Sequence, residues 1–207
     1  MCETCSYGYA HQSFALHPQH YLMYLTQKFI RNGGHIIRSR INHILDPLID
    51  PNVVIIVNCT GNGARTLGGV QDILCYPIRG QTVLVNAPDV KKTITQLGKN
   101  VSYIIPRPDG NVILGGTRDS YSWVETPSLE TEARIIQDCV TMCPQLVKHG
   151  FKTVDIVGRG VGFRPGRIGG PRIEANPVFM HNDRRKCIVA HNYGHASYGT
   201  LLIVIFI

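Results

Sequence analysis

The stretch that decides the fold of this chain is Ile188-Val189-Ala190-His191-Asn192-Tyr193-Gly194-His195-Ala196-Ser197-Tyr198-Gly199. Its apolar start, residues 188–190, predicts a buried strand, which opens into a loop of glycine, small and aromatic residues. Because most of these loop residues carry little side chain, their backbone N–H and C=O groups can approach a flat ligand closely. The stretch therefore predicts a strand that leads into a ligand-binding loop, and an ordinary glycine-rich turn is the alternative.

A second strand is predicted by the continuous β-branched run 53–58, Val-Val-Ile-Ile-Val-Asn. Such a run is typical of a strand buried on both faces, as in a parallel sheet. It ends in Cys59-Thr60-Gly61-Asn62-Gly63-Ala64-Arg65-Thr66. A strand followed by G-x-G suggests a dinucleotide-binding turn, but Thr66 holds the third glycine position and no acidic residue follows at the expected distance. We therefore interpret this turn as a secondary cofactor contact.

Two helices are predicted by the spacing of apolar residues. They recur at helical spacing over residues 21–30, and Asn32-Gly33-Gly34 supplies a C-terminal cap before a predicted strand at 35–41. Residues 129–143 form an amphipathic pattern that Pro144 ends. The apolar face of this second helix is expected to consist of Leu129, Ala133, Ile136 and Val140.

Strand signals are dense from residue 77 onward. Two apolar runs around Pro108-Asp109-Gly110 predict a hairpin, and further strands are expected at 154–157, 161–163 and 173–174. The predicted fold class is α+β, with a mixed-sheet lobe over 77–182 inserted into an α/β lobe. Within it, a mixed sheet is expected over 77–174, and a smaller sheet is expected to pair 35–41, 53–58 and 186–190.

The composition indicates a globular protein. The 207 residues, 43% of them hydrophobic and 17% charged, suffice for one compact domain or two small ones. The net charge of +7 comes from scattered basic residues, and no nucleic-acid-binding motif accompanies it. We therefore expect no nucleic acid partner and some attraction for anionic ligands.

Cysteine usage predicts an intracellular protein. Seven cysteines are an odd number and no signal peptide precedes them, so a disulfide framework is not expected. Cys2 and Cys5 have the spacing of a metal-binding pair, but no second pair matches it, so no metal is expected. The longest apolar run, Leu201–Ile207, is too short to span a bilayer, so no membrane association is expected.

The absence of several catalytic motifs reduces the number of enzyme classes to which the chain can belong. Gly-x-Ser-x-Gly, His-Glu-x-x-His and the P-loop do not occur, which argues against hydrolases and kinases. The stretch 162–174, Gly-Phe-Arg-Pro-Gly-Arg-Ile-Gly-Gly-Pro-Arg-Ile-Glu, carries three arginines. Planar guanidinium groups bind carboxylates in a bidentate manner, so we expect an anion site at Arg172. Arg167 is interpreted instead as a residue of a solvated basic loop.

The loop 191–199, His-Asn-Tyr-Gly-His-Ala-Ser-Tyr-Gly, resembles the flavin-binding signature of the D-amino-acid oxidase and D-aspartate oxidase family. The stretch 162–174 is similar to the family segment whose last arginine holds the α-carboxylate of the substrate, which implies that role for Arg172. Residues 102–107, Ser-Tyr-Ile-Ile-Pro-Arg, match the family tyrosine that joins this arginine, which implies that role for Tyr103. Without the resemblance, Tyr103 is equally well a half-buried strand residue.

The resemblance implies that FAD is the cofactor. The implied flavin contacts are Thr60 and Gly61, Ile41 beside the adenine, and the backbone of Ala196, Ser197, Tyr198, Gly199 and Thr200. The Ser197 carbonyl falls on the contact to the substrate amine. Arg118 resembles the arginine that meets a side-chain carboxylate in D-aspartate oxidases; its alternative is a surface cation paired with Asp119.

The implied reaction is the oxidative deamination of a D-amino acid by dioxygen to a 2-oxo acid, ammonia and hydrogen peroxide. No side-chain acid or base is needed, because the flavin accepts a hydride from Cα and the protein orients the substrate. Acidic substrates such as D-aspartate are one expectation. The resemblance also implies a peroxisomal or cytoplasmic location and allows a homodimer.

The resemblance covers residues 14–200, which are expected to divide into three parts and a tail. Residues 14–76 are the distal part of an FAD-binding lobe, 77–182 a substrate-binding lobe and 183–200 the closing strand and flavin loop, while 201–207 form an atypical apolar tail. The family's G-x-G-x-x-G unit does not occur before Phe14, so the purified chain is expected to be free of flavin. A truncated, non-catalytic remnant of such an oxidase, which keeps the fold but binds no flavin, is therefore the second hypothesis.

Overall fold

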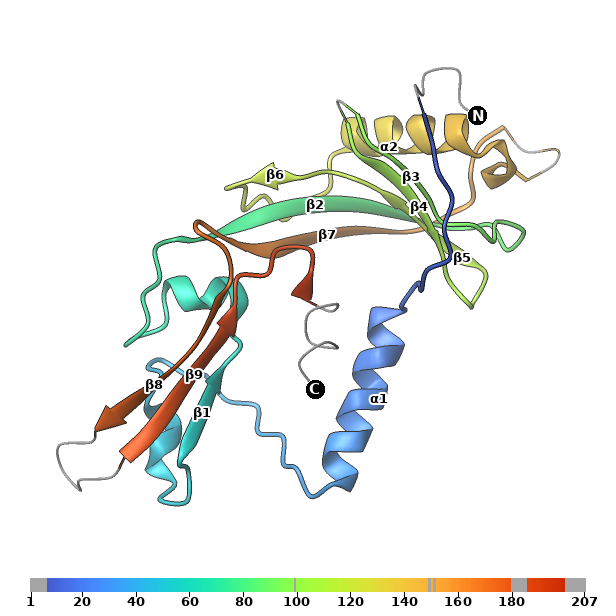
Figure 1. Cartoon of the computed structure of the whole chain (residues 1–207). Coiled ribbons are helices and arrows are strands. Elements are labelled where there is room, and N and C mark those ends of the chain that lie inside the picture. The colour runs from blue at the N-terminus through green and yellow to red at the C-terminus, as the bar shows by residue number, and fades with distance from the viewer. Residues whose placement is uncertain (1–6, 99, 149, 151, 180–185, 200–207) are drawn as a thin grey trace. The chain divides into compact units, whose positions relative to one another are not determined.

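The computed structural model describes residues 7–98, 100–148, 150, 152–179 and 186–199 (Figure 1). The chain divides into two compact units. The first unit comprises residues 1–37, 80–118 and 124–162, and the second comprises 38–79, 119–123 and 163–207. Each unit is thus built from segments that lie far apart in the sequence.

The larger sheet contains six strands in the order β3-β4-β5-β2-β6, with β7 paired to β2. Their bounds are β2 Cys75–Asn86, β3 Ile94–Gln96, β4 Ser102–Pro106, β5 Asn111–Gly115, β6 Asp119–Ser120 and β7 Ile156–Arg167. The predicted hairpin is confirmed as β4 and β5, and the Arg107 N–H closes its turn on the Asn111 carbonyl at 2.8 Å. Every strand pair of this sheet whose register is described is antiparallel, so the mixed pairing expected here is wrong.

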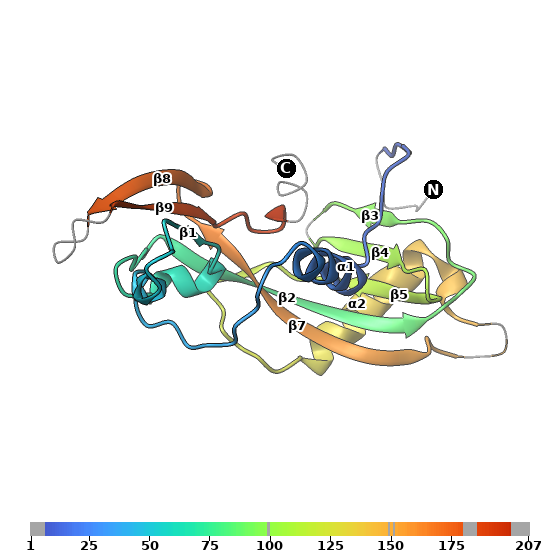
Figure 2. The same cartoon turned by 90° about the horizontal axis from the view of Figure 1, so that it is seen from below.

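Helix α2 (Leu129–Met142) confirms the second predicted helix, and it packs against β4 and β5 (Figure 2). It begins at Ser128, whose hydroxyl accepts the Thr131 N–H at 3.2 Å, and the short helix η3 (Pro144–Leu146) follows it. The core here consists mainly of aliphatic side chains from the sheet and the helix: Val83, Val85, Ile104, Val112, Leu114, Ile135 and Leu146.

The buried face of α2 differs from the prediction. The helix buries Glu132, Ile135 and Cys139, whereas Leu129 is 74% exposed. Glu132 accepts two hydrogen bonds from Arg159 on β7, at 2.5 and 2.8 Å, so its charge is compensated inside the fold. Helical periodicity assigned this position to the solvent face because the sequence does not show a partner 27 residues away.

Helix α1 (Pro18–Arg31) confirms the first predicted helix. It ends at Asn32, and Gly33 follows with a φ of +86°, the left-handed conformation that suits a helix end. None of its residues is buried in the structure as described. Its apolar residues, including Leu22, Met23, Phe29 and Ile30, remain more than half exposed.

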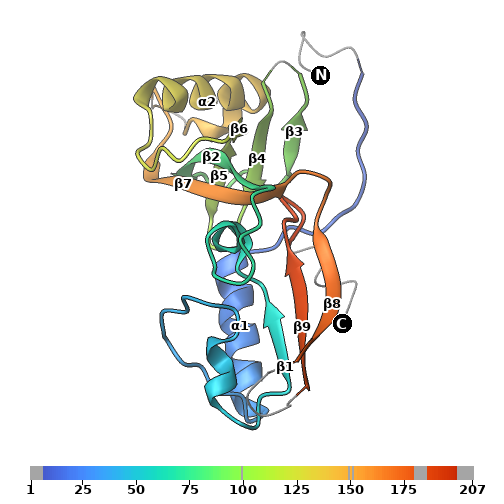
Figure 3. The same ribbon diagram turned by 90° about the vertical axis from the view of Figure 1, so that its left-hand side faces the viewer.

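The second unit is built on a three-stranded sheet of β1 (Ile55–Asn58), β9 (Lys186–Tyr193) and β8 (Arg172–Phe179), which lie side by side in that order (Figure 3). β1 and β9 are parallel, with Ile55 opposite Ile188 and Asn58 opposite His191, which confirms the predicted pairing of these segments. β8 is antiparallel to β9. The mixed sheet of this protein is therefore the smaller one.

Two predictions for this sheet are wrong. Residues 35–41 form no strand, and β8 instead occupies the second edge of β9. β1 was expected to be buried on both faces, but its burial alternates: Ile56 is 8% exposed, whereas Ile55 and Val57 are 55% and 61% exposed. Only one face of β1 is covered, by a small core of Ile44, Leu48, Ile56, Leu67, Cys187 and Val189.

Two short helices, η1 (Asp46–Ile49) and η2 (Gly61–Arg65), complete the second unit. η2 follows β1 directly, where the sequence shows the G-x-G turn. Across the described ranges, no helix has the length and apolar character required to cross a membrane.

Candidate functional site

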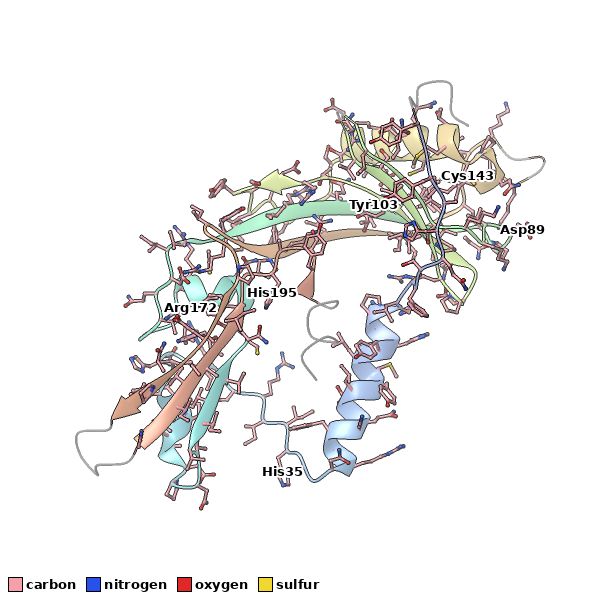
Figure 4. The ribbon with its side chains drawn as sticks, in the orientation of Figure 1. His35, Asp89, Tyr103, Cys143, Arg172 and His195 are labelled. Carbon is pink, nitrogen blue, oxygen red and sulfur yellow. The ribbon has the colours of Figure 1, made fainter. Side chains whose placement is uncertain are left out.

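Arg172 is the first residue of β8 and lies directly opposite Tyr193 of β9 (Figure 4). Its Nε donates to the Glu174 carboxylate at 2.6 Å, and its Nη1 donates to the Tyr193 hydroxyl at 3.0 Å. A guanidinium group has five N–H donors, of which these bonds to described residues take two. The remaining donors can therefore bind a carboxylate, as the sequence predicts for Arg172.

Tyr193 connects Arg172 to a buried carboxylate that the sequence did not identify. The Tyr193 hydroxyl lies 2.8 Å from Asp72 Oδ2, and Tyr193 is only 2% exposed. A guanidinium cannot accept a hydrogen bond and a carboxylate cannot donate one, so both directions are determined. Arg172 donates to the Tyr193 oxygen, and the Tyr193 hydroxyl donates to Asp72.

Arg167 is the next member of this chain of hydrogen bonds. Its Nε donates to the same Asp72 Oδ2 at 2.8 Å, and its side chain is only 18% exposed. The interpretation of Arg167 as a solvated loop residue is therefore wrong. Gly194 lies against it: a Cβ at this position would be 2.8 Å from the Arg167 Cβ, and its φ is +85°. Only glycine suits a backbone that is both left-handed and this close to a side chain.

The charges of this group support one another. Burial alone would raise the pKa of Asp72, but the hydrogen bonds from Arg167, Tyr193 and the Leu74 amide outweigh it and lower that pKa below its ordinary value. Burial likewise opposes the charge of Arg172, yet the bonds to Tyr193 and Glu174 raise its pKa above the ordinary value. Burial raises the pKa of the Tyr193 phenol, with a further contribution from Asp72. Arg172 is thus charged and the Tyr193 phenol is neutral.

A second buried pair joins β1 to β9. Asn58 Oδ1 accepts from the amide and the hydroxyl of Thr60, at 3.2 and 2.7 Å, so Asn58 Nδ2 points to His191 Nδ1 at 3.1 Å. His191 must then accept this bond, which requires the neutral ring. Burial lowers the pKa of His191, and the nearby charge of Arg172 lowers it further, which agrees with that state. Thr60, a predicted flavin contact, is positioned by this network.

Acid is expected to destabilise the second unit. Because the folded pKa of His191 lies below the ordinary 6.5, stability falls as the pH drops below about 6.5 toward the folded value. Asp72 contributes stability above about pH 3.9, which is lost as the pH falls through its lowered folded pKa. The free energy of unfolding, measured with urea at a series of pH values from about 8 down to about 3, tests both windows. Asp72→Asn should remove the lower window only, and a flat profile would contradict the assignment.

Three segments converge on Pro165 of β7. The Ala196 amide donates to the Pro165 carbonyl at 2.7 Å, and a Cβ at Gly61 would lie 3.5 Å from the Pro165 Cβ. Asn62 Nδ2 donates to the neighbouring Phe163 carbonyl at 3.1 Å. The turn after β1 and the loop after β9, both predicted flavin contacts, are therefore brought together within one unit. Pro165 itself carries no sequence signal for this role.

Two buried polar atoms in this region, Asn62 Oδ1 and His195 Nδ1, have no hydrogen-bond partner among the described residues. His195 Nε2 donates to Asn192 Oδ1 at 2.6 Å, and in the tautomer that carries its proton on Nε2 the Nδ1 atom is an acceptor, like Asn62 Oδ1. Unpaired buried acceptors are costly, so a ligand rich in O–H and N–H donors fits this region. FAD, with its ribityl hydroxyls and ring N–H, is such a ligand.

The remaining predicted cofactor residues differ in backbone conformation and in exposure to solvent. Ala196 has a φ of +51°, a strained conformation for a residue with a Cβ, which is common at ligand-binding turns. Ser197 and Tyr198 are exposed, and Gly199 is half-buried. Ile41 is 44% exposed. Thr200 lies outside the described residues.

Tyr103 lies on β4, opposite Gly115 of β5 (Figure 4). A Cβ at Gly115 would overlap its ring, and one at Gly116 would lie 2.7 Å from its hydroxyl, so the ring lies flat over these two glycines. Tyr103 belongs to the first unit and Arg172 to the second. Their convergence on one carboxylate therefore stays a prediction.

Arg118 is exposed, and the ion pair with Asp119, which was the alternative to a substrate role, is not formed between these two described residues. Asp119 pairs instead with the buried Arg79, at 3.4 Å. Among the described residues, Arg118 has no ion pair. Within the same residues, no cluster of three or more His, Cys, Asp or Glu side chains has the arrangement of a metal site. Cys2 and Cys5 lie outside them.

Comparisons with known proteins show the family of this chain. Residues 4–205 match the family model described as FAD dependent oxidoreductase. The chain is 35% identical over 199 residues to the D-amino-acid oxidase of Schizosaccharomyces pombe, covering 94% of this chain and 56% of that protein. It is 31% identical over 201 residues to the D-aspartate oxidase of Talaromyces thermophilus, covering 95% and 52%. The chain thus spans about half the length of the curated relatives it matches.

The fold is also similar to solved structures. Glycine oxidase from Geobacillus kaustophilus superimposes with a TM-score of 0.55 at 24% identity, covering 72% of this chain and 38% of that one. L-proline dehydrogenase from P. horikoshii gives a TM-score of 0.53 at 16% identity, covering 72% and 40%. At these identities the likeness concerns the fold alone.

Proposed function

Because the chain belongs to the FAD dependent oxidoreductase family, we propose that it serves in the oxidation of D-amino acids to 2-oxo acids, ammonia and hydrogen peroxide. The observation that carries this proposal is the Arg172 guanidinium, held by Tyr193 and Glu174 with donors left over for a carboxylate. The identity to a D-amino-acid oxidase and to a D-aspartate oxidase supports the same substrate class.

In this proposal each polar group of the substrate has one partner. Arg172 binds the α-carboxylate, and Tyr103 donates its hydroxyl to the same group. The Ser197 carbonyl accepts a hydrogen bond from the α-amine. Three contacts around one Cα select one enantiomer, so the substrate is oriented without a side-chain acid or base.

FAD, when bound, supplies the acceptor for the hydride that leaves Cα. The residues proposed to hold it are Thr60, Gly61 and the backbone of 196–199, with Ile41 beside the adenine. Asn62 and His195 add the two unpartnered buried acceptors to this set. The same loop thus serves cofactor and substrate.

Arg118 is the residue that we propose distinguishes acidic from neutral substrates. It is exposed and has no ion pair among the described residues, so its charge is available to a second carboxylate. D-aspartate carries this second carboxylate and D-alanine does not. We propose residues 77–182 as the substrate lobe and residues 14–76 and 183–200 as the parts of the FAD-binding lobe. Arg118 belongs to the substrate lobe, and the apolar segment 201–207 is assigned to neither lobe.

The experiment that tests the function is a peroxide assay on the purified protein with added FAD. D-aspartate and D-alanine are compared with their L-enantiomers at equal concentration. We expect peroxide from the D-enantiomers only, and a preference for D-aspartate that Arg118→Ala removes while the rate with D-alanine persists. Peroxide from neither enantiomer, by a protein with a native circular dichroism spectrum, would favour the second hypothesis of a non-catalytic chain.

A further inference from the structure

The strongest feature that the proposed reaction leaves unused is the hydrogen-bond chain Arg167–Asp72–Tyr193–Arg172. It connects the end of β7, the turn before β2, the end of β9 and the start of β8. Every member lies in the second unit. Asp72 is 8% exposed and Tyr193 2%, so the middle of the chain is shielded from water.

Within this hydrogen-bond chain, Asp72 is held in place by backbone hydrogen bonds. Asp72 donates its amide to the Ala64 carbonyl at 3.0 Å, and its Oδ1 accepts the Leu74 amide at 3.1 Å. Its other oxygen, Oδ2, takes both Tyr193 and Arg167 at 2.8 Å. The position of Asp72 is therefore determined before any ligand binds.

Arg167 also connects Asp72 to the turn that leads into β8. Its Nη1 donates to the Gly170 carbonyl at 3.2 Å, while the Gly170 amide donates to the Arg167 carbonyl at 3.2 Å. This turn ends two residues before Arg172. Asp72 thus acts on Arg172 by two routes. Through Tyr193 it orients the Arg172 side chain, and through Arg167 it holds the turn that leads the backbone into Arg172.

We propose, on the basis of the function proposed above, that Tyr193 and Asp72 are positioning residues for the carboxylate site at Arg172. A free arginine side chain is flexible, and ordering it on ligand binding lowers affinity. The hydrogen bond that Arg172 donates to the buried Tyr193 orders the guanidinium beforehand. Glu174 also holds it, but the Glu174 side chain is 47% exposed, so water and salt weaken that bond. Tyr193 therefore provides most of the restraint.

The test uses Tyr193→Phe, which removes one hydroxyl and keeps the buried ring. Tyr121→Phe is the control, because Tyr121 is exposed and its ring stacks on Tyr76, whereas the Arg172 side chain bonds to Tyr193 and Glu174. The guanidinium N–H signals of Arg172 are followed by nitrogen NMR on the whole chain and assigned through their loss in Arg172→Lys. The affinities for D-alanine and for D-alaninamide, which lacks the carboxylate, are then measured by titration under argon.

We expect slow guanidinium rotation at Arg172 in the parent and in Tyr121→Phe, and averaged signals in Tyr193→Phe. The preference for D-alanine over its amide should fall about tenfold or more in Tyr193→Phe, the effect of one charge-assisted bond. Asp72→Asn should give the same loss and decides the matter if Tyr193→Phe does not fold.

Two outcomes separate this inference from the proposed function. Unchanged Arg172 signals and an unchanged preference in folded Tyr193→Phe would overturn the positioning role. If the signals average as expected but the parent does not distinguish D-alanine from its amide, the positioning role stands and the carboxylate site is wrong.

Discussion

Replacing Arg172 by alanine is expected to raise KM for D-amino acids by about 100-fold or more, while kcat changes far less. Each hydrogen bond to a charged group contributes roughly 1.5–3 kcal/mol, and the proposed site loses two of them together. The main loss is in binding, because the carboxylate does not react. Steady-state kinetics with D-alanine and D-aspartate measure both parameters.

Two further variants make this result specific. Arg172→Lys keeps the charge but loses the planar fork, so it should lie between the parent and Arg172→Ala. Arg38→Ala removes an exposed arginine of the same unit and should leave both parameters unchanged. Since Arg172→Ala also removes the hydrogen bonds that Glu174 and Tyr193 accept from Arg172, thermal unfolding is measured alongside. Equal KM values for Arg172→Ala and the parent would remove Arg172 from the site.

Gly115→Ala should both destabilise the first unit and impair the substrate site. The added Cβ would overlap the Tyr103 ring, which lies opposite Gly115 in the β4–β5 pair. Overpacking of this kind costs about 1–3 kcal/mol in the free energy of unfolding. The displaced ring also moves the hydroxyl proposed to bind the carboxylate, so KM should rise. Urea unfolding and kinetics measure the two effects separately.

A double-mutant cycle tests the cause. Tyr103→Ala removes the ring, so Gly115→Ala should cost less in that background than in the parent. Gly162→Ala is the control, since a Cβ there meets nothing within 4 Å. Additive effects of Tyr103→Ala and Gly115→Ala would mean that the ring does not constrain Gly115.

Local sequence signals predicted much of this fold. Ser128 and Pro144 mark the ends of α2, and Pro108-Asp109-Gly110 marks the β4–β5 hairpin, because caps and turns act within a few residues. The parallel pairing of β1 with β9 also followed from two apolar runs. The caps and the hairpin turn need no knowledge of distant partners, because they are local.

The errors at Glu132 and Arg167 share one physical cause, which is a partner far away in the sequence. Glu132 is buried because Arg159 neutralises it, and Arg167 is drawn in from the solvent to 18% side-chain exposure because Asp72, 95 residues away, pairs with it. Asp72 itself lies in the turn before β2, and nothing nearby in the sequence marks it as the acceptor for Tyr193. Residues 35–41 have the composition of a strand but form none in the structure.

The central claim is that a D-amino acid held at Arg172 loses its α-hydrogen to FAD, and anaerobic mixing tests this most directly. The FAD-supplied protein is mixed with D-alanine, with D-alanine deuterated at Cα, and with L-alanine, and the visible flavin absorbance is followed. We expect bleaching by D-alanine, slower bleaching by the deuterated substrate, and none by L-alanine. Retention of the flavin colour with every D-amino acid, or bleaching by both enantiomers alike, would contradict the claim.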